Sequence, residues 1–221
     1  LPVRRTVRAM RGFTDEESKW RFVAEQARAL KAKGQPVLIG TRTVAASESL
    51  AKSLNETGLS HALLNGVRDE DEAQIIAAAG QAGQVTIATN MAGRGTDIVP
   101  SESALEAGGL QVIATEYHRS SRVDRQLHGR SGRQGQPGVV APLGSWEDEI
   151  IRHYLPSWWR RWGQRLLGNG KWLEMSLSIS QWRAGRHDTA RRLTVLRQDQ
   201  WLDEHLSLGQ ANVMKPGKFN S

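Results

Sequence analysis

Five short apolar runs, separated by segments with helical spacing, constrain the fold of this chain most strongly. The runs lie at 36–40, 61–64, 85–89, 110–115 and 139–143. Runs of this length, bounded by glycines and polar residues, are typical of strands buried on both faces of a parallel sheet. Their alternation with helices predicts an α/β fold, an open and mostly parallel sheet flanked by helices. In such folds ligands bind beyond the carboxyl ends of the strands.

The segments between these runs carry helix signals. Helices are predicted at 15–33, from 44 to about 54, at 69–79 and at 122–130. Thr14 is the candidate N-cap of the first helix, because Glu17 follows three residues later and completes a capping box. Thr43 is the candidate N-cap of the second helix. Residues 1–11 mix basic and apolar side chains, which predicts a linker or the beginning of a fragment.

The composition changes near residue 144. Residues 1–150 contain 18 basic and 18 acidic side chains, so the whole net charge of +7 lies in residues 151–221. Seven of the eight tryptophans also lie from residue 146 onward. The strand pattern ends there, and we predict helix over 147–167, either split at Pro156 or with Pro156 in a first turn. A further helix is predicted from 179 to about 208, followed by a loose tail. Two domains are therefore expected, 1–144 and an all-α extension at 145–221.

Composition excludes several classes of site. The 221 residues include no cysteine, which removes disulfides and thiolate metal sites and fits a reducing compartment. The six histidines show no metal-ligand spacing, so no bound transition metal is expected. No apolar run approaches the ~18 residues of a membrane span, and the first residues do not resemble a signal peptide.

The most specific chemical signal is Q-L-H-G-R-S-G-R at 126–133. It matches Q-x-x-G-R-x-G-R, the sixth motif of superfamily-two helicases and related motors. A guanidinium is always charged and grips phosphate oxygens through two donors, and an inserted arginine stabilises a phosphoryl group in transfer. Arg130 and Arg133 are the candidate arginine fingers, and Gln126 would orient the attacking water or contact the γ-phosphate. The alternative is a basic surface loop.

A second glycine-rich stretch, T-N-M-A-G-R-G-T-D-I at 89–98, follows the third predicted strand. Asp97 would accept hydrogen bonds from ribose hydroxyls, and Arg94 would couple the phosphate state to domain closure. Gly95 and Thr96 would lie against the nucleotide, because glycine allows close approach of the loop. In the structural alternative, Asp97 pairs with Arg94 or Arg133 and holds the two loops together.

The string A-T-N-M-A-G-R-G-T-D-I at 88–98 resembles the fifth motif of the SecA family, the ATPases of bacterial preprotein translocation. Further SecA-like strings stand in order: G-Q-P-V-L-I-G-T at 34–41, G-L-Q-V-I at 109–113 and R-V-D-R-Q-L at 122–127. The dense part of the resemblance covers about residues 34–150. It implies that 1–144 is a second RecA-like nucleotide-binding domain. Q-W-R-A-G-R at 181–186 resembles the start of the family's long scaffold helix, which the extension would begin.

The resemblance also implies that the ATP site is shared with another domain. No G-x-x-x-x-G-K-[ST] phosphate loop and no D-E-A-D-like acidic pair occurs in the sequence. In SecA these parts belong to a first RecA-like domain, which would therefore bind ATP and Mg²⁺ together with this one. The chain alone is expected to be inactive. Unfolded preprotein and a membrane translocon are the implied partners, with a location in the cytoplasm or at the inner face of the cell membrane.

Departures from the family pattern keep other functions open. His128 and Tyr117 stand where SecA usually has arginine, and Gln136 stands where it usually has aspartate. These changes indicate a divergent member. A superfamily-two nucleic-acid helicase and a non-catalytic SecA-like remnant are the alternatives. Nucleic acid is the less favoured partner, because residues 1–150 carry no net positive charge.

The segment W-W-R-R-W at 158–162, with Arg165, has two interpretations. Trp159 and Trp162 would pack on the α/β domain while the arginines remain solvated, which is the expectation. Alternatively, the tryptophans and arginines would contact an anionic membrane, where indole rings lie at the interface and guanidinium groups meet phosphate.

Overall fold

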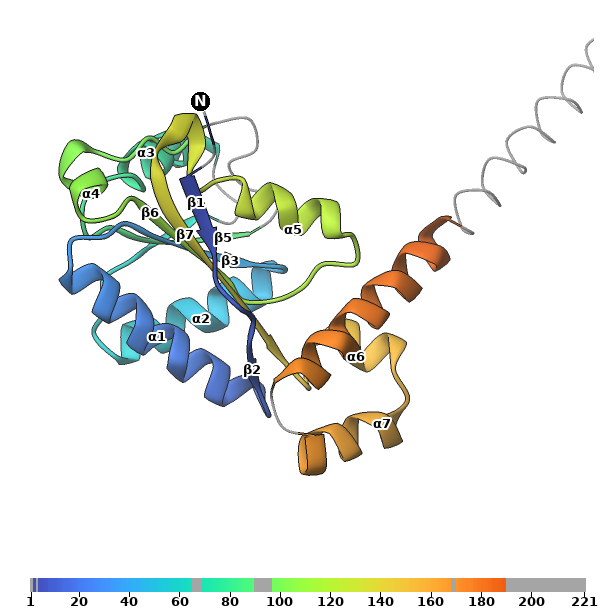
Figure 1. Cartoon of the computed structure of the whole chain (residues 1–221). Coiled ribbons are helices and arrows are strands. Elements are labelled where there is room, and N and C mark those ends of the chain that lie inside the picture. Colours follow the sequence, from blue (N-terminus) through green and yellow to red (C-terminus); the bar gives the residue numbers. More distant parts are fainter. Residues whose placement is uncertain (1, 3, 65–68, 90–96, 168–169, 190–221) are drawn as a thin grey trace, which may run out of the picture.

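The computed structural model describes residues 2, 4–64, 69–89, 97–167 and 170–189. A parallel sheet forms its centre (Figure 1), with the strand order β1-β7-β6-β3-β5-β4 and with β2 also paired to β7. The strands are β1 (Arg4–Val7), β2 (Arg11–Phe13), β3 (Val37–Thr41), β4 (Ala62–Leu64), β5 (Val85–Thr89), β6 (Leu110–Ala114) and β7 (Pro137–Ser145). The predicted parallel α/β sheet is confirmed.

Helices cover both faces of the sheet (Figure 1). The helices of the α/β part are α1 (Glu16–Ala32), α2 (Val44–Glu56), α3 (Asp69–Ala78), α4 (Glu102–Glu106) and α5 (Ser121–His128), and α6 (Glu149–Tyr154) and α7 (Ser157–Trp162) follow β7. Helices α1 and α2 pack on one face, where Val23 and Leu50 meet Ile39 of β3. On the opposite face, Ile76 of α3 packs in a cluster with Leu38 of β3.

Adjacent residues of β3 therefore enter two different cores, because successive side chains of a strand point to opposite faces. All five residues of β3 are buried. This explains why the central strands appear in the sequence as unbroken apolar runs rather than as an alternation.

Two predictions at the amino-terminal end are wrong. Asp15, and not Thr14, caps α1: its Oδ1 accepts from the Ser18 backbone N–H at 2.7 Å. The Thr14 hydroxyl instead donates to Asp15 Oδ2. Residues 1–11 are also no simple linker, because they contribute β1 and β2, which pair in parallel with successive parts of β7. Strand β1 lies at the edge and is mostly exposed, and β2 is three residues long with Phe13 as its buried residue, so neither shows the apolar run of a central strand.

A helical lobe follows β7. Helices α6 and α7 and a helix at 171–189 enclose a third core around the fully buried Trp146, with Ile151, Leu173 and Leu177. The predicted division at Pro156 is confirmed. The last helix begins at 171 rather than at 179, because Leu173 and Leu177 already form its buried face. The predicted helix and tail beyond 189 lie outside the described residues.

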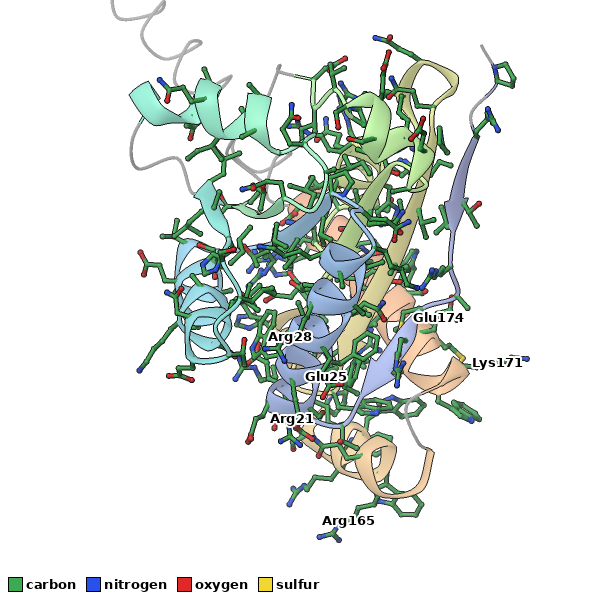
Figure 2. The ribbon with its side chains drawn as sticks, turned by 90° about the vertical axis from the view of Figure 1, so that its left-hand side faces the viewer. Arg21, Glu25, Arg28, Arg165, Lys171 and Glu174 are labelled. Carbon is green, nitrogen blue, oxygen red and sulfur yellow. The ribbon has the colours of Figure 1, made fainter. Side chains whose placement is uncertain are left out.

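Charged side chains lie on the outer sides of α1 and of the last helix, although several tryptophans of the helical lobe are also exposed. Figure 2 shows Arg21, Glu25 and Arg28 along the outer side of α1, and Lys171 and Glu174 on the last helix. Within the described part of the chain, no helix combines the length and the apolar character needed to cross a membrane.

Candidate functional site

The turn between α5 and β7 carries the sixth-motif residues. It reverses the chain through three residues with left-handed backbone: Gly132 at φ 68°, Gln134 at φ 53° and Gly135 at φ 77°. A Cβ atom at Gly132 would lie 2.6 Å from Cβ of Arg5, so only glycine fits there. The buried hydroxyl of Ser131 donates to the Leu110 carbonyl at 2.8 Å and ties the turn to β6.

Strand β1 braces the same turn. Arg5 Nη1 donates to the carbonyl of His128 at 3.0 Å and to that of Ser131 at 3.4 Å. The brace therefore comes from a segment that sequence reasoning treated as a linker. No local pattern marks Arg5 for this role, since the contact joins residues more than 120 positions apart.

An ion pair joins the two predicted motifs. A guanidinium nitrogen of Arg133 contacts a carboxylate oxygen of Asp97, while Arg133 Nε donates to the Gly129 carbonyl at 2.9 Å. The Arg133 and Asp97 side chains are 35% and 47% exposed, so solvent and ligands can still reach the pair. The predicted structural pairing of Asp97 with Arg133 is confirmed. An anion that approaches Arg133 would compete with Asp97 for the guanidinium.

The other candidate residues are placed less fully. Arg130 is half-buried in the same turn, and Gln126 is exposed on α5. Arg94, Gly95 and Thr96 lie outside the described residues. The catalytic and nucleotide-binding roles of all seven candidates remain predictions.

The ion pair does not lie at the carboxyl ends of the strands, where the general rule places ligands. Arg133 precedes β7, and its neighbour Gly132 contacts Arg5, which pairs with Gly138 near the start of β7. On the other side, Ser101 donates its backbone N–H to the carbonyl of Gly80, which precedes β5. Arg133 is therefore placed beside the amino end of β7, and a ligand bound at this pair would be an exception to the general rule.

His128 occupies a position beside this turn and is half-buried. Burial lowers the pKa of its imidazole below the usual 6.5; the nearby Asp124 carboxylate opposes this shift, and the positive charge of Arg5 adds to it. His128 is therefore uncharged at neutral pH. Unlike an arginine, it adds no positive charge to the turn.

A polar cluster at the carboxyl ends of the strands was missed by sequence reasoning. Lys19 of α1 is fully buried, and its Nζ lies 2.6 Å from Asp148 Oδ1. Arg42, which follows β3, pairs with Glu116 at 3.3 Å and also contacts Glu149. Burial raises the pKa of the Glu116 carboxyl above its ordinary value. The contacts of Lys19 with Asp148 and of Arg42 with Glu149 join the α/β domain to the helical lobe.

One sequence signal could have revealed this cluster. Lys19 stands four residues before Val23 and eight before Ala27, on the buried stripe of α1. A lysine on such a stripe is rarely buried without a partner. A carboxylate partner was therefore predictable in kind, although its position at Asp148 was not.

The tryptophans of α7 divide between core and surface. Trp159 packs against the third core and donates its indole N–H to Ser176 Oγ at 3.1 Å. Trp158 and Trp162 are 58% and 62% exposed, so the predicted packing of Trp162 is wrong. Residues 158 and 162 are four apart and share the outer side of the helix. Together with Arg161 and Arg165 they line a surface hollow, and Figure 2 shows Arg165 pointing away from the body.

Comparisons with known proteins agree with the motifs. A family model described as the SecA P-loop domain matches residues 2–104 and 99–166. The chain is 55% identical over 141 residues to protein translocase subunit SecA 2 of Bordetella avium, covering 64% of this chain and 21% of that protein. It is 40% identical over 216 residues to SecA 2 of Magnetococcus marinus, covering 93% of this chain and 32% of the relative. The chain thus spans less than a third of the length of these relatives.

A solved structure supports the fold independently. The Escherichia coli DEAD-box protein SrmB, crystallised with the regulator of ribonuclease activity A, superposes with a TM-score of 0.51 at 22% identity. The match covers 67% of this chain and 80% of that chain. At this identity the likeness concerns the fold alone, which is of the RecA-like kind.

Proposed function

Because this chain belongs to the SecA P-loop domain family, we propose that it is the second half of an ATPase motor that moves polypeptides across a membrane. Residues 1–144 would form the second RecA-like domain, and 145–221 the start of a helical scaffold. A first RecA-like domain of the same protein would hold the ATP phosphates and Mg²⁺. The observation that carries the proposal is the ion pair between Arg133, on the turn braced by Arg5, and Asp97, which brings together the two motifs that the sequence singled out.

The chemistry follows from the charges of this turn. When the first domain presents the γ-phosphate of ATP, its oxygens compete with Asp97 for Arg133 and draw the two domains together. Arg133 and Arg130 then stabilise the negative charge that spreads over the transferring phosphoryl group. Gln126 orients the attacking water. Asp97, released from Arg133, accepts hydrogen bonds from the ribose hydroxyls, while Arg94, Gly95 and Thr96 complete the nucleotide contact.

The partners follow from the same proposal. The Bordetella and Magnetococcus relatives are named protein translocase subunits, which supports unfolded preprotein as the cargo and a membrane translocon as the docking partner. The protein would work in the cytoplasm, at the inner face of the cell membrane. The helicase alternative is compatible with the RecA-like fold that the chain shares with SrmB. This fold serves motors with either kind of cargo, so it does not discriminate between polypeptide and nucleic acid.

The cargo can be tested directly with the complete protein. Steady-state ATP hydrolysis is measured alone, with a permanently unfolded polypeptide, and with duplex RNA or DNA. We expect stimulation by the polypeptide and none by the duplexes. The isolated 221-residue chain should show no turnover, because half of the phosphate site lies elsewhere. Stimulation by a duplex alone would favour the helicase, and robust hydrolysis by the isolated chain would refute the shared site.

We further propose that Trp158, Trp162, Arg161 and Arg165 form a contact for anionic membranes. Two exposed indoles beside two guanidinium groups match an interface of acyl chains and phosphate headgroups. Each basic residue near an anionic surface contributes about 1 kcal/mol of attraction.

This contact predicts the outcome of vesicle flotation. The double variant Trp158→Ala/Trp162→Ala should bind vesicles containing phosphatidylglycerol several-fold less than the parent protein, with little binding of either to pure phosphatidylcholine. Trp182→Ala is the matched control, since Trp182 is 60% exposed but lies on the last helix, where Arg186 stacks on its ring. Equal flotation of the double variant and the parent would exclude this contact.

A further inference from the structure

A buried hydrogen-bond junction connects the last helix to α5. The side-chain amide of Gln181 donates to Asp124 Oδ2 at 2.5 Å and to the His118 carbonyl at 2.8 Å. The other carboxylate oxygen of Asp124 accepts from the His118 backbone N–H at 3.0 Å and lies 2.9 Å from His118 Nδ1. Three segments therefore meet at one carboxylate: the last helix, the loop after β6, and α5.

Asp124 is a polar anchor of α5. It is the one buried residue of that eight-residue helix, and Leu127 is only partly buried against the second core. A buried carboxylate requires hydrogen-bond donors, because a carboxylate oxygen that loses its donor keeps the cost of desolvation without compensation. The position of α5 consequently depends on the donors that surround Asp124.

The donor from Gln181 sits on a firmly held element. Leu173, Leu177 and Ala184 of the last helix are fully buried, and Leu173 and Leu177 pack around Trp146 in the third core. Gln181 lies one helical turn after Leu177 in the last helix. Because that helix is held by its buried side chains, Gln181 has little freedom to move with α5 if α5 shifts. The junction therefore fixes α5 to the helical lobe as well as to the sheet.

We propose that Gln181 is a positioning residue for the arginine turn, acting through Asp124. Helix α5 is a short rigid rod of about 12 Å, and it continues through Gly129 into the turn that carries Arg130 and Arg133. A tilt of the rod at Asp124 moves the guanidinium groups at its other end. The inference rests on the proposed function, because it assigns Gln181 the task of holding these groups in register with a phosphate.

The test uses three variants of the complete protein. Gln181→Met keeps the length and volume of the side chain but removes both donors. Gln181→Lys supplies N–H donors again at the same position. Ser178→Ala is the matched control, since Ser178 is exposed on the same helix and bonds only to the Glu174 carbonyl within it.

A misplacement of catalytic groups by about 1 Å can reduce a rate ~100-fold. We expect Gln181→Met to lower kcat for ATP hydrolysis by about tenfold or more, with KM within about twofold and an almost unchanged Tm. Gln181→Lys should recover most of kcat, and Ser178→Ala should match the parent. A fall in Tm that accompanies the loss of kcat, without recovery by lysine, would show a purely structural contact and overturn the proposal.

Hydrogen exchange provides a readout that does not depend on catalysis. In Gln181→Met the amides of residues 121–128 should exchange faster than in the parent, while those of β6 remain unchanged. If Arg133→Ala abolishes hydrolysis but Gln181→Met changes neither kcat nor exchange, the positioning role alone is wrong. If Arg133→Ala is fully active, the proposed function fails, and exchange in α5 still decides whether Gln181 anchors that helix.

Discussion

Replacement of Arg133 by alanine in the complete protein should lower the turnover number for ATP about 1000-fold, with nucleotide binding largely retained. An arginine that stabilises the transferring phosphoryl group contributes ~10³-fold or more to turnover. The guanidinium is held by the Gly129 carbonyl and by Asp97, on a turn whose shape requires glycine at 132. Loss of the side chain therefore removes the charge but leaves the turn braced by Arg5.

The measurement combines steady-state hydrolysis with equilibrium binding of a fluorescent ATP analogue. Arg133→Lys keeps a positive charge but loses the two-pronged geometry, and should recover little of the rate. Arg125→Ala is the control, because Arg125 is an exposed arginine of α5 that bonds only weakly to Ser121 Oγ at 3.3 Å. Turnover within twofold of the parent for Arg133→Ala would exclude an arginine finger at this position.

Replacement of Asp148 by asparagine should lower the free energy of unfolding by about 3–5 kcal/mol, because the buried Lys19 ammonium would lose its closest counter-charge and keep the half-exposed Glu16 at 4.0 Å. The Lys19 and Asp148 side chains are 0% and 2% exposed and their charged atoms are 2.6 Å apart. Asp148 also accepts from the backbone N–H and the hydroxyl of Ser145, so it fixes the turn that leads from β7 into the helical lobe.

Urea denaturation of the parent, the single variant and Lys19→Met/Asp148→Asn would measure this effect. Removal of both charges should restore most of the lost stability, because the methionine at position 19 is buried without a charge that needs a partner. Glu17→Gln breaks the exposed pair of Glu17 with Arg21 and should cost less than about 1 kcal/mol. A double variant as unstable as Asp148→Asn would show that the charge of Lys19 is not the cause.

The sequence predicted the elements whose physical signal is local. Residues 37–41 and 85–89 form central strands and are buried throughout, so most of their side chains are apolar and the buried exceptions are threonines. Strands β1 and β2 were not predicted, because an edge strand is held by backbone hydrogen bonds and needs few apolar side chains. Arg4 and Arg11 even place charges on them, and each is exposed.

The sequence identified the residues of the candidate site, but not the residues that hold them in place. Motif spacing identified Arg133 and Asp97, and the structure brings them into contact. The contacts that hold this turn and α5 come from Arg5 and Gln181, at the two ends of the described chain. Contacts over such sequence distances leave no periodicity in either partner, and only the assembled sheet brings them together.

The brace from Arg5 has a practical consequence for shortened forms of this domain. Strand β1 contributes almost no buried side chain, so a chain trimmed to begin after Val7 would retain all three apolar cores. Such a trimmed domain would look intact by circular dichroism while the carbonyls of His128 and Ser131 had lost their guanidinium donor. A folded signal would then no longer report the geometry of the arginine turn, and biochemical work on this domain should keep its first strand.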